Sequence, residues 1–174
     1  MLIANQKKQT NIVEYLLYMW QLEDLIRASN FDINLLYDKV ISGYKENRKT
    51  LDEITEWYSE LIISMKQEGL TKTGHLSYLN EIVNSLQKKH EQLIKNKDQA
   101  KYHELYAWAA VNIKKIKEKS IEKNQSEIEY ALNMLYGVLM LRLKGKQISQ
   151  ETLSALATVS GMMAFLAKSY KENI

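Results

Sequence analysis

The stretch IVEYLLYMWQLEDLIR, residues 12–27, decides the fold class. Eleven of its 16 residues are aliphatic, methionine or aromatic. A helix of this composition is apolar nearly all round, which is typical of a helix at the centre of a bundle. Outside this stretch, apolar residues recur at spacings of three and four along almost the whole chain, and strict alternation is absent. The sequence therefore predicts an all-α protein.

Capping residues and stop signals divide the chain into seven predicted helices. Two starts have the capping-box spacing, Thr50 with Glu53 and Ser126 with Glu129. Two ends coincide with glycine, at Gly69 and Gly145. The expected starts are Thr10 or Asn11, Asp32, Thr50, His75, Asp98, Ser126 and Ser149, and the expected ends lie near residues 28, 44, 68, 95, 119, 145 and 171.

Length and composition favour one domain over residues 1–174, a bundle of six or seven helices with short loops. The chain has no proline, which suits long helices, and no repeat or long linker divides it. It also has no cysteine, so disulfides, thiolate nucleophiles and cysteine-bound zinc are excluded. We expect a cytoplasmic protein, because the first residues lack the apolar run of a signal peptide.

Charge and hydropathy give no indication of a nucleic-acid or membrane partner. The net charge is +3, with 24 basic residues of which only Arg27, Arg48 and Arg142 are arginine. A surface that reads bases or phosphates usually needs arginine, because its guanidinium binds bidentately. The longest uncharged run, residues 152–167, is too short and too polar for a membrane span.

The N-terminal segment MLIANQKKQTNIVEYLLYMWQLEDLIRASNFD, residues 1–32, resembles the opening of an uncharacterised all-helical family found in Bacteroidetes genomes. The resemblance is clearest over these residues, and the length and helical pattern extend it to the whole chain. It implies an all-helical fold. Because that family has no assigned activity, cofactor or catalytic residue, the resemblance assigns no site to this chain.

A polar cluster is predicted on the first apolar helix. Glu23, Asp24 and Arg27 continue the face that begins with Ile12 and Trp20, and both carboxylates are spaced to reach the guanidinium. Charges on a buried face need partners. We therefore expect a structural ion network at this point. The alternative is a polar site at the end of an apolar pocket, where paired carboxylates act as acid and base.

The last predicted helix has two unlike faces. Small side chains allow another backbone to approach closely, whereas bulky ones fill a core. We expect the small face to pack inside the bundle; a homodimer seam and the wall of a ligand pocket are the alternatives. The small face consists of Ser154, Ala157, Gly161 and Ala164, and the bulky face of Leu156, Val159, Met163, Leu166 and Tyr170.

The segment ISQETLSALATVS, residues 148–160, resembles the start of a phage-repressor helix-turn-helix. Two departures weigh against this resemblance. Thr158 stands where the turn usually has glycine, and the following residues, GMMAFL at 161–166, offer no polar side chain to base edges. DNA binding is therefore only a remote alternative.

No metal or cofactor site is predicted. The three histidines, His75, His90 and His103, do not complete a metal-binding motif, and His90 lies on an apolar helix face where a satisfied core histidine is expected. Trp108 and Val111 lie off the core stripe of their helix, so either that helix packs on two sides or they mark a contact surface.

The function expected from these observations is a non-enzymatic one, carried out through protein–protein contacts and above all through self-association as a homo-oligomer. Two alternatives stay open. The first is a small-molecule-binding protein or enzyme with a pocket near Glu23, Asp24 and Arg27. The second is the remote possibility of DNA binding through residues 148–166.

Overall fold

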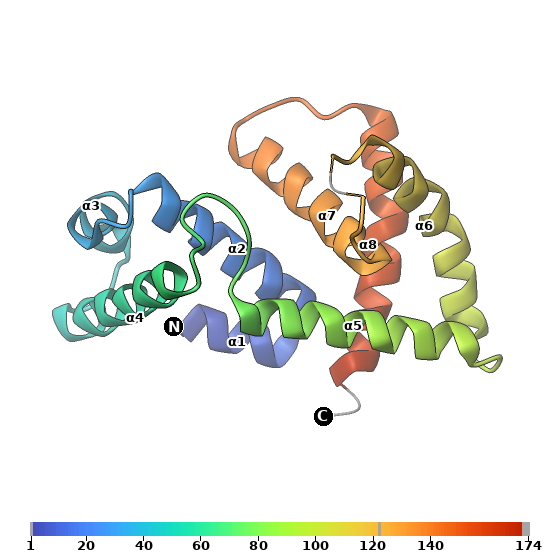
Figure 1. Ribbon diagram of the computed structural model, residues 1–174, viewed down its shortest axis with the longest axis horizontal. Helices are drawn as coiled ribbons and strands as arrows, with labels where there is room; N and C mark the ends of the chain where they lie inside the picture. Colours follow the sequence, from blue (N-terminus) through green and yellow to red (C-terminus); the bar gives the residue numbers. More distant parts are fainter. Residues whose placement is uncertain (1, 122, 172–174) are drawn as a thin grey trace. The chain divides into compact units, whose positions relative to one another are not determined.

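The computed structural model describes residues 2–121 and 123–171 (Figure 1). Every regular element in these residues is helical, so the predicted all-α class is confirmed. Eight α-helices and one 3₁₀ turn are present there, rather than six or seven helices. They are α1 (Leu2–Thr10), α2 (Ile12–Ala28), α3 (Ile33–Lys39), η1 (Ile41–Gly43), α4 (Arg48–Gln67), α5 (Ser77–Lys95), α6 (Ala100–Lys119), α7 (Glu127–Leu143) and α8 (Gln150–Lys171).

The chain divides into two compact units. Unit 1 comprises Met1–Thr10 and Glu14–Asn80, and unit 2 comprises Asn11–Val13 and Glu81–Ile174. The helices α2 and α5 therefore contribute to both units. One domain over residues 1–174 stays a prediction.

Unit 1 has its core on α2, α3 and α4. The apolar character of α2 is matched by its burial, and α4 adds the stripe of apolar residues that its 3,4 spacing predicts. Each fully buried aliphatic or aromatic side chain stabilises the fold by about 1.5–3 kcal/mol. The buried side chains include Leu16, Met19, Trp20, Leu22 and Ile26 of α2, Leu36 of α3, and Tyr58, Leu61, Ile62 and Met65 of α4.

Unit 2 is built from α6, α7 and α8 together with most of α5, and its three last helices pack against one another in pairs. The bulky face of α8 points into this core as predicted. Val159, Met163 and Leu166 are buried, and Leu156 and Tyr170 are half-buried. Ala109 and Ile113 of α6 are buried beside them in the same unit.

Several helix termini agree with the sequence, and in each of them the cap is local. Asp32 accepts from the backbone N–H groups of Asn34 and Leu35 at the start of α3. Ser126 and Glu129 form the predicted capping box of α7. Gly69, with φ of 71°, ends α4, and the next residue, Leu70, donates its N–H to the Met65 carbonyl. This left-handed conformation is the one that glycine adopts without steric cost.

Four predicted termini are wrong. The second predicted helix ends at Lys39, and a separate 3₁₀ turn covers Ile41–Gly43, whereas the helix was expected to continue to about Tyr44. The predicted third helix starts at Arg48 rather than Thr50, because Asn47 caps it and accepts from the Thr50 N–H at 3.0 Å. The fourth starts at Ser77 rather than His75. The fifth starts at Ala100 rather than at a cap on Asp98.

An additional helix, α1, precedes the first predicted one. The first predicted helix begins at Thr10 or Asn11, and Asn11 does accept from the Val13 N–H at 3.1 Å, as a cap for α2. The residues before it are nevertheless helical from Leu2. Their 3,4 apolar pattern is weak, because Lys7, Lys8 and further polar residues occupy most of the segment.

The helix-turn-helix interpretation of residues 148–166 is wrong. The helix α8 runs without interruption from Gln150 to Lys171, and Thr158, which stands at the presumed turn, is inside it. The Thr158 hydroxyl donates to the Ala155 carbonyl of the preceding turn of this helix. Across residues 2–121 and 123–171, no helix is both long and apolar enough to span a bilayer.

Candidate functional site

The predicted polar cluster lies in unit 1, where Glu23 is one of the most buried charged side chains. The Glu23 side chain is 1% exposed. One carboxylate oxygen accepts from the Leu76 backbone N–H at 2.9 Å, and the other lies 2.5 Å from Nδ1 of His75. The His75 ring in turn stacks on the indole of Trp20, with centroids 4.1 Å apart. Glu23 therefore holds the residues that directly precede α5.

Arg27 extends the same contact along the connection between α4 and α5. Its Nε donates to the Leu70 carbonyl at 3.2 Å and its Nη2 to the Gly74 carbonyl. Its Nη1 donates to Asp24 at 3.0 Å. The pairing of Asp24 with Arg27 matches the predicted spacing. Glu23, however, binds His75 and Leu76 instead of the guanidinium, and Asp24 is half exposed rather than buried.

These contacts support the structural interpretation of the cluster. Both oxygens of Glu23 are engaged by groups that hold the chain in place, and the guanidinium of Arg27 spans two loop carbonyls and a carboxylate. A backbone N–H bound by a carboxylate at the start of a helix is a charge-assisted cap. The cluster thus contacts residues 70, 74, 75 and 76 of the connection between α4 and α5. The prediction did not include His75, because His75 lies 52 positions from Glu23 and no local sequence pattern links the two residues.

The small face of α8 is exposed instead of packed inside the bundle. Ser154, Ala157 and Ala164 are exposed, and Gly161 is half-buried. A Cβ atom added to Gly161 would lie 3.5 Å from Cδ2 of Leu105, an ordinary contact. Within the described part of the chain, the expected close-packed neighbour is therefore missing at three of the four positions. The homodimer seam, the alternative interpretation, stays a prediction.

The helix α6 lies antiparallel beside α8 in unit 2 (Figure 1). Three contacts set the alignment: Tyr102 with Phe165 (ring centroids 5.4 Å apart), Leu105 with Gly161, and Asn112 with Thr158 (3.0 Å). Trp108 is 65% exposed and Val111 is 59% exposed. At 100° per residue, both point away from the unit's core, and Trp108 is at the level of Gly161 and Thr158.

We name this surface the outer α6–α8 face. It consists of Trp108, Val111, Ser154, Ala157, Gly161 and Ala164. A large aromatic side chain and a strip of small ones thus share one side of a two-helix layer. The off-stripe position of Trp108 and Val111 was visible in the sequence; the alignment of α6 with α8 was not.

A buried histidine joins three helices of unit 2. His90 of α5 is 2% exposed; its Nδ1 lies 2.6 Å from the Tyr102 hydroxyl and its Nε2 3.2 Å from a carboxylate oxygen of Glu127. The Tyr106 hydroxyl donates to the same carboxylate oxygen at 2.8 Å. Burial lowers the pKa of His90, and the Glu127 carboxylate opposes this effect without cancelling it. This is the satisfied core histidine that the sequence predicted.

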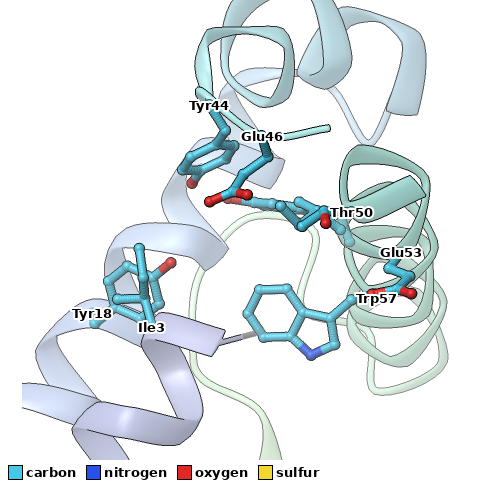
Figure 2. A pocket seen from close by; sticks show the side chains of 9 residues that line it. Ile3, Tyr18, Tyr44, Glu46, Thr50, Glu53 and Trp57 are labelled. Carbon is cyan, nitrogen blue, oxygen red and sulfur yellow. The ribbon is translucent and has the colours of Figure 1, made fainter. Parts of the chain in front are cut away.

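A pocket of about 140 Å³ lies in unit 1 and contains none of the predicted site residues (Figure 2). We name it the Trp57 pocket. Four of its nine lining residues are aromatic, and two are glutamates. It is lined by Ile3 of α1, Tyr18 of α2, Tyr44 and Glu46 of the segment after η1, and Thr50, Glu53, Ile54, Trp57 and Tyr58 of α4. These residues are spread over more than 50 positions, so no sequence spacing could have assembled them.

Comparison with known protein families gives a match over the whole chain. A family described as "Domain of unknown function (DUF4924)" matches residues 1–174. No curated protein and no solved structure matches the chain. The family match covers far more than the segment 1–32 that suggested an uncharacterised helical family, and it supplies no activity, cofactor or site residue.

Proposed function

The chain belongs to the family described as Domain of unknown function (DUF4924), and we propose that it acts through protein–protein contacts, by self-association across the outer α6–α8 face. The observation that carries this proposal is the exposure of Trp108, at 65% of its surface, on a helix whose neighbour has Ala157 and Gly161 near the same level. Tryptophan is highly buried on average and is among the residue types most enriched at interface hot spots.

The shape of the face suits a second copy of the same chain. In a twofold interface the same patch serves both partners, so a protruding group must meet a depression on that patch. The indole of Trp108 is such a group, and the small side chains of Ala157 and Gly161 leave room for one. Each copy would then bury its Trp108 on the partner's α8.

The charges around the face do not oppose this arrangement. Lys101 pairs with Glu104 at one end of it (2.8 Å), and Lys115 lies 4.0 Å from Glu151 at the other. Each end of the face therefore carries one positive and one negative side chain. Because like charges facing one another destabilise an interface, a mixed rim permits either relative direction of the two copies.

Light scattering on a size-exclusion column tests the proposal with a matched pair of variants. We expect a dimer mass for the unmodified chain and a monomer mass for Trp108→Glu, because a charge in place of a buried interface tryptophan weakens association by more than about thirtyfold. The control is Ile63→Glu. Ile63 is 54% exposed on α4 of unit 1, and this variant is expected to stay dimeric.

Circular dichroism at the same concentrations separates loss of association from loss of folding. Trp108→Glu is expected to keep the helical spectrum of the unmodified chain, since its side chain contributes little to the core. A monomer mass for the unmodified chain at every concentration up to the solubility limit would contradict the proposal. Equal effects of the two variants would also contradict it.

The other interpretations have less support. The contacts of Glu23 and Arg27 are made with other parts of the same chain. This favours a structural ion network over an acid–base site near Glu23, Asp24 and Arg27. The motif that suggested DNA binding is an uninterrupted helix at residues 150–166. A non-enzymatic role, a single domain over residues 1–174, a cytoplasmic location and an origin in Bacteroidetes stay predictions.

A further inference from the structure

The walls of the Trp57 pocket are aromatic on several sides. In Figure 2 the Trp57 indole extends from α4 into the space that faces Tyr18 and Ile3, and Tyr44 borders the same space from the segment after η1. Tyr58 of α4 completes the lining. An aromatic ring carries partial negative charge on its faces, so a positive group surrounded by several rings is attracted to all of them.

The formal charges on the pocket wall are negative. Glu46 and Glu53 line it, and the described residues of its lining include no lysine, arginine or histidine. Figure 2 shows the Glu46 carboxylate on the same side of the Trp57 ring as Tyr44, and the Glu53 carboxylate beside the indole on α4. Neither carboxylate has an ion-pair partner among the residues that the structure describes. A cation in the pocket would therefore lie near two carboxylates that no ion pair engages in the described part of the chain.

A buried hydroxyl group on the wall has no well-aligned hydrogen bond. Tyr58 is 1% exposed, and its oxygen has no partner of ordinary hydrogen-bond geometry within the described residues. The Tyr44 hydroxyl is its polar neighbour, and burial together with this neighbour raises the pKa of Tyr58, so the phenol stays neutral. Buried polar atoms are nearly always satisfied, so this hydroxyl leaves room for an ordered water or for a polar group of a ligand.

The size of the pocket limits what it can hold. A cavity of about 150 Å³ takes up benzene, and the Trp57 pocket, at about 140 Å³, is nearly the same size. A trimethylammonium group fits this space and a dinucleotide or a peptide segment does not. We propose that the Trp57 pocket binds the methylated ammonium group of a small organic cation.

Two competing occupants are less well matched. A bare metal ion needs several oxygen, nitrogen or sulfur ligands at short range, and no cluster of three or more acidic, histidine or cysteine side chains exists in the described residues. A neutral apolar molecule would fill the volume but would gain no attraction from the two exposed glutamates on the wall. The charge on the wall therefore favours a cation, and the rings favour one whose charge is spread over methyl groups.

Nuclear magnetic resonance titration of the full chain tests the proposal. The probes are choline and its uncharged isostere 3,3-dimethylbutan-1-ol, which share shape and hydroxyl group and differ in charge. We expect choline to shift the Trp57 indole N–H signal, identified by its absence in Trp57→Phe, and to bind about three- to thirtyfold more tightly than the isostere. A short peptide with trimethyllysine, tested beside choline, distinguishes a protein side chain from a free small molecule as the source of the ammonium group.

Variants with matched controls assign the binding to this pocket. Trp57→Leu is expected to weaken choline binding at least about tenfold, since the largest ring is removed. Glu46→Gln and Glu53→Gln are exposed, conservative changes that leave folding intact, and each should weaken binding about two- to fivefold at low salt. Trp108→Leu and Glu60→Gln, which do not line the pocket, are the controls and should leave binding unchanged.

Three results would overturn the proposal. The first is the absence of any choline-dependent shift of the Trp57 signal up to tens of millimolar. The second is equal affinity for choline and the isostere, which would mean an apolar pocket without cation selectivity. The third is binding that persists in Trp57→Leu and in the glutamate variants. Because the pocket is in unit 1, none of these results bears on self-association through unit 2.

Discussion

Glu23 and Asp24 are adjacent in sequence and lie in different environments. The Glu23 side chain is 1% exposed and binds His75 and the Leu76 N–H, whereas the Asp24 side chain is 50% exposed and pairs with Arg27 at the surface. Water can take over the contacts of an exposed carboxylate, but it has little access to the contacts of a buried one. The two residues therefore differ in what they contribute to stability.

We predict that Glu23→Gln lowers the free energy of unfolding by about 2–3 kcal/mol. The amide can still accept from the Leu76 N–H, but it removes the charge that His75 faces. Asp24→Asn, the matched neighbour, should cost less than about 1 kcal/mol because exposed ion pairs contribute little. Urea unfolding followed by circular dichroism measures both changes.

If the two variants lose the same stability, or if Glu23→Gln is more stable than the unmodified chain, the interpretation of the cluster as a structural ion network is wrong. A gain in stability is what a strained ligand-binding carboxylate would produce, since binding sites often hold unfavourable charges. The same measurement thus distinguishes the two interpretations that the sequence left open for this cluster.

At the scale of helices, the His90 network connects α5, α6 and α7 through one buried ring. A neutral ring protonated on Nε2 satisfies both of its contacts, accepting from the Tyr102 hydroxyl and donating to Glu127. Because burial lowers the pKa of His90 below its ordinary value of 6.5, the folded chain takes up this proton less readily than the unfolded chain. The unfolded state therefore gains protons first as the pH falls.

We predict that the free energy of unfolding falls more steeply with decreasing pH below about 6.5 in the unmodified chain than in His90→Gln. Above this pH the His90 contribution is complete, and it is lost as the unfolded state becomes protonated. Denaturant unfolding at several pH values between about 7.5 and 5 measures the difference in unfolding free energy between the two proteins. The carboxylates titrate in both proteins, so their contribution largely cancels in this difference. A constant difference between the two proteins over this range contradicts the prediction, and so does a difference that grows toward acid pH.

Helix starts could be predicted from the sequence only where the capping group is local. Asp32 and Ser126 cap helices through side chains two or three residues away, so the pattern is contained in the sequence itself. The start of α5 is different. Glu68 accepts from the Ser77 N–H and Glu23 from the Leu76 N–H, so carboxylates from outside this helix act as caps. No short-range rule indicates such partners.

On the scale of the whole molecule, the fold class followed from the sequence and the functional surfaces did not. The period of three and four residues predicts a helix wherever it occurs, and the apolar stretch 12–27 requires a core around it. The Trp57 pocket joins residues from Ile3 to Tyr58, and the outer α6–α8 face joins Trp108 to Ala157. Both depend on how helices align, which side-chain periodicity leaves undetermined.

The small face of α8 is a second example of this limit. The spacing of its four small residues defines a helix face, but it cannot distinguish a partner helix within the chain from a partner in a second copy. The exposure of Ser154, Ala157 and Ala164 removes the first option for the described residues and leaves the second to be tested.

The most direct test of self-association uses the absence of cysteine from the chain, which makes an engineered thiol unique. Ala157→Cys places it on the outer α6–α8 face, and Ala28→Cys places a control thiol at an exposed alanine of unit 1. The measurement is the rate of thiol alkylation at increasing protein concentration. We predict that the rate for Ala157→Cys falls as dimers form, while the rate for Ala28→Cys stays constant. Alkylation rates that do not change with concentration in either variant would contradict the account.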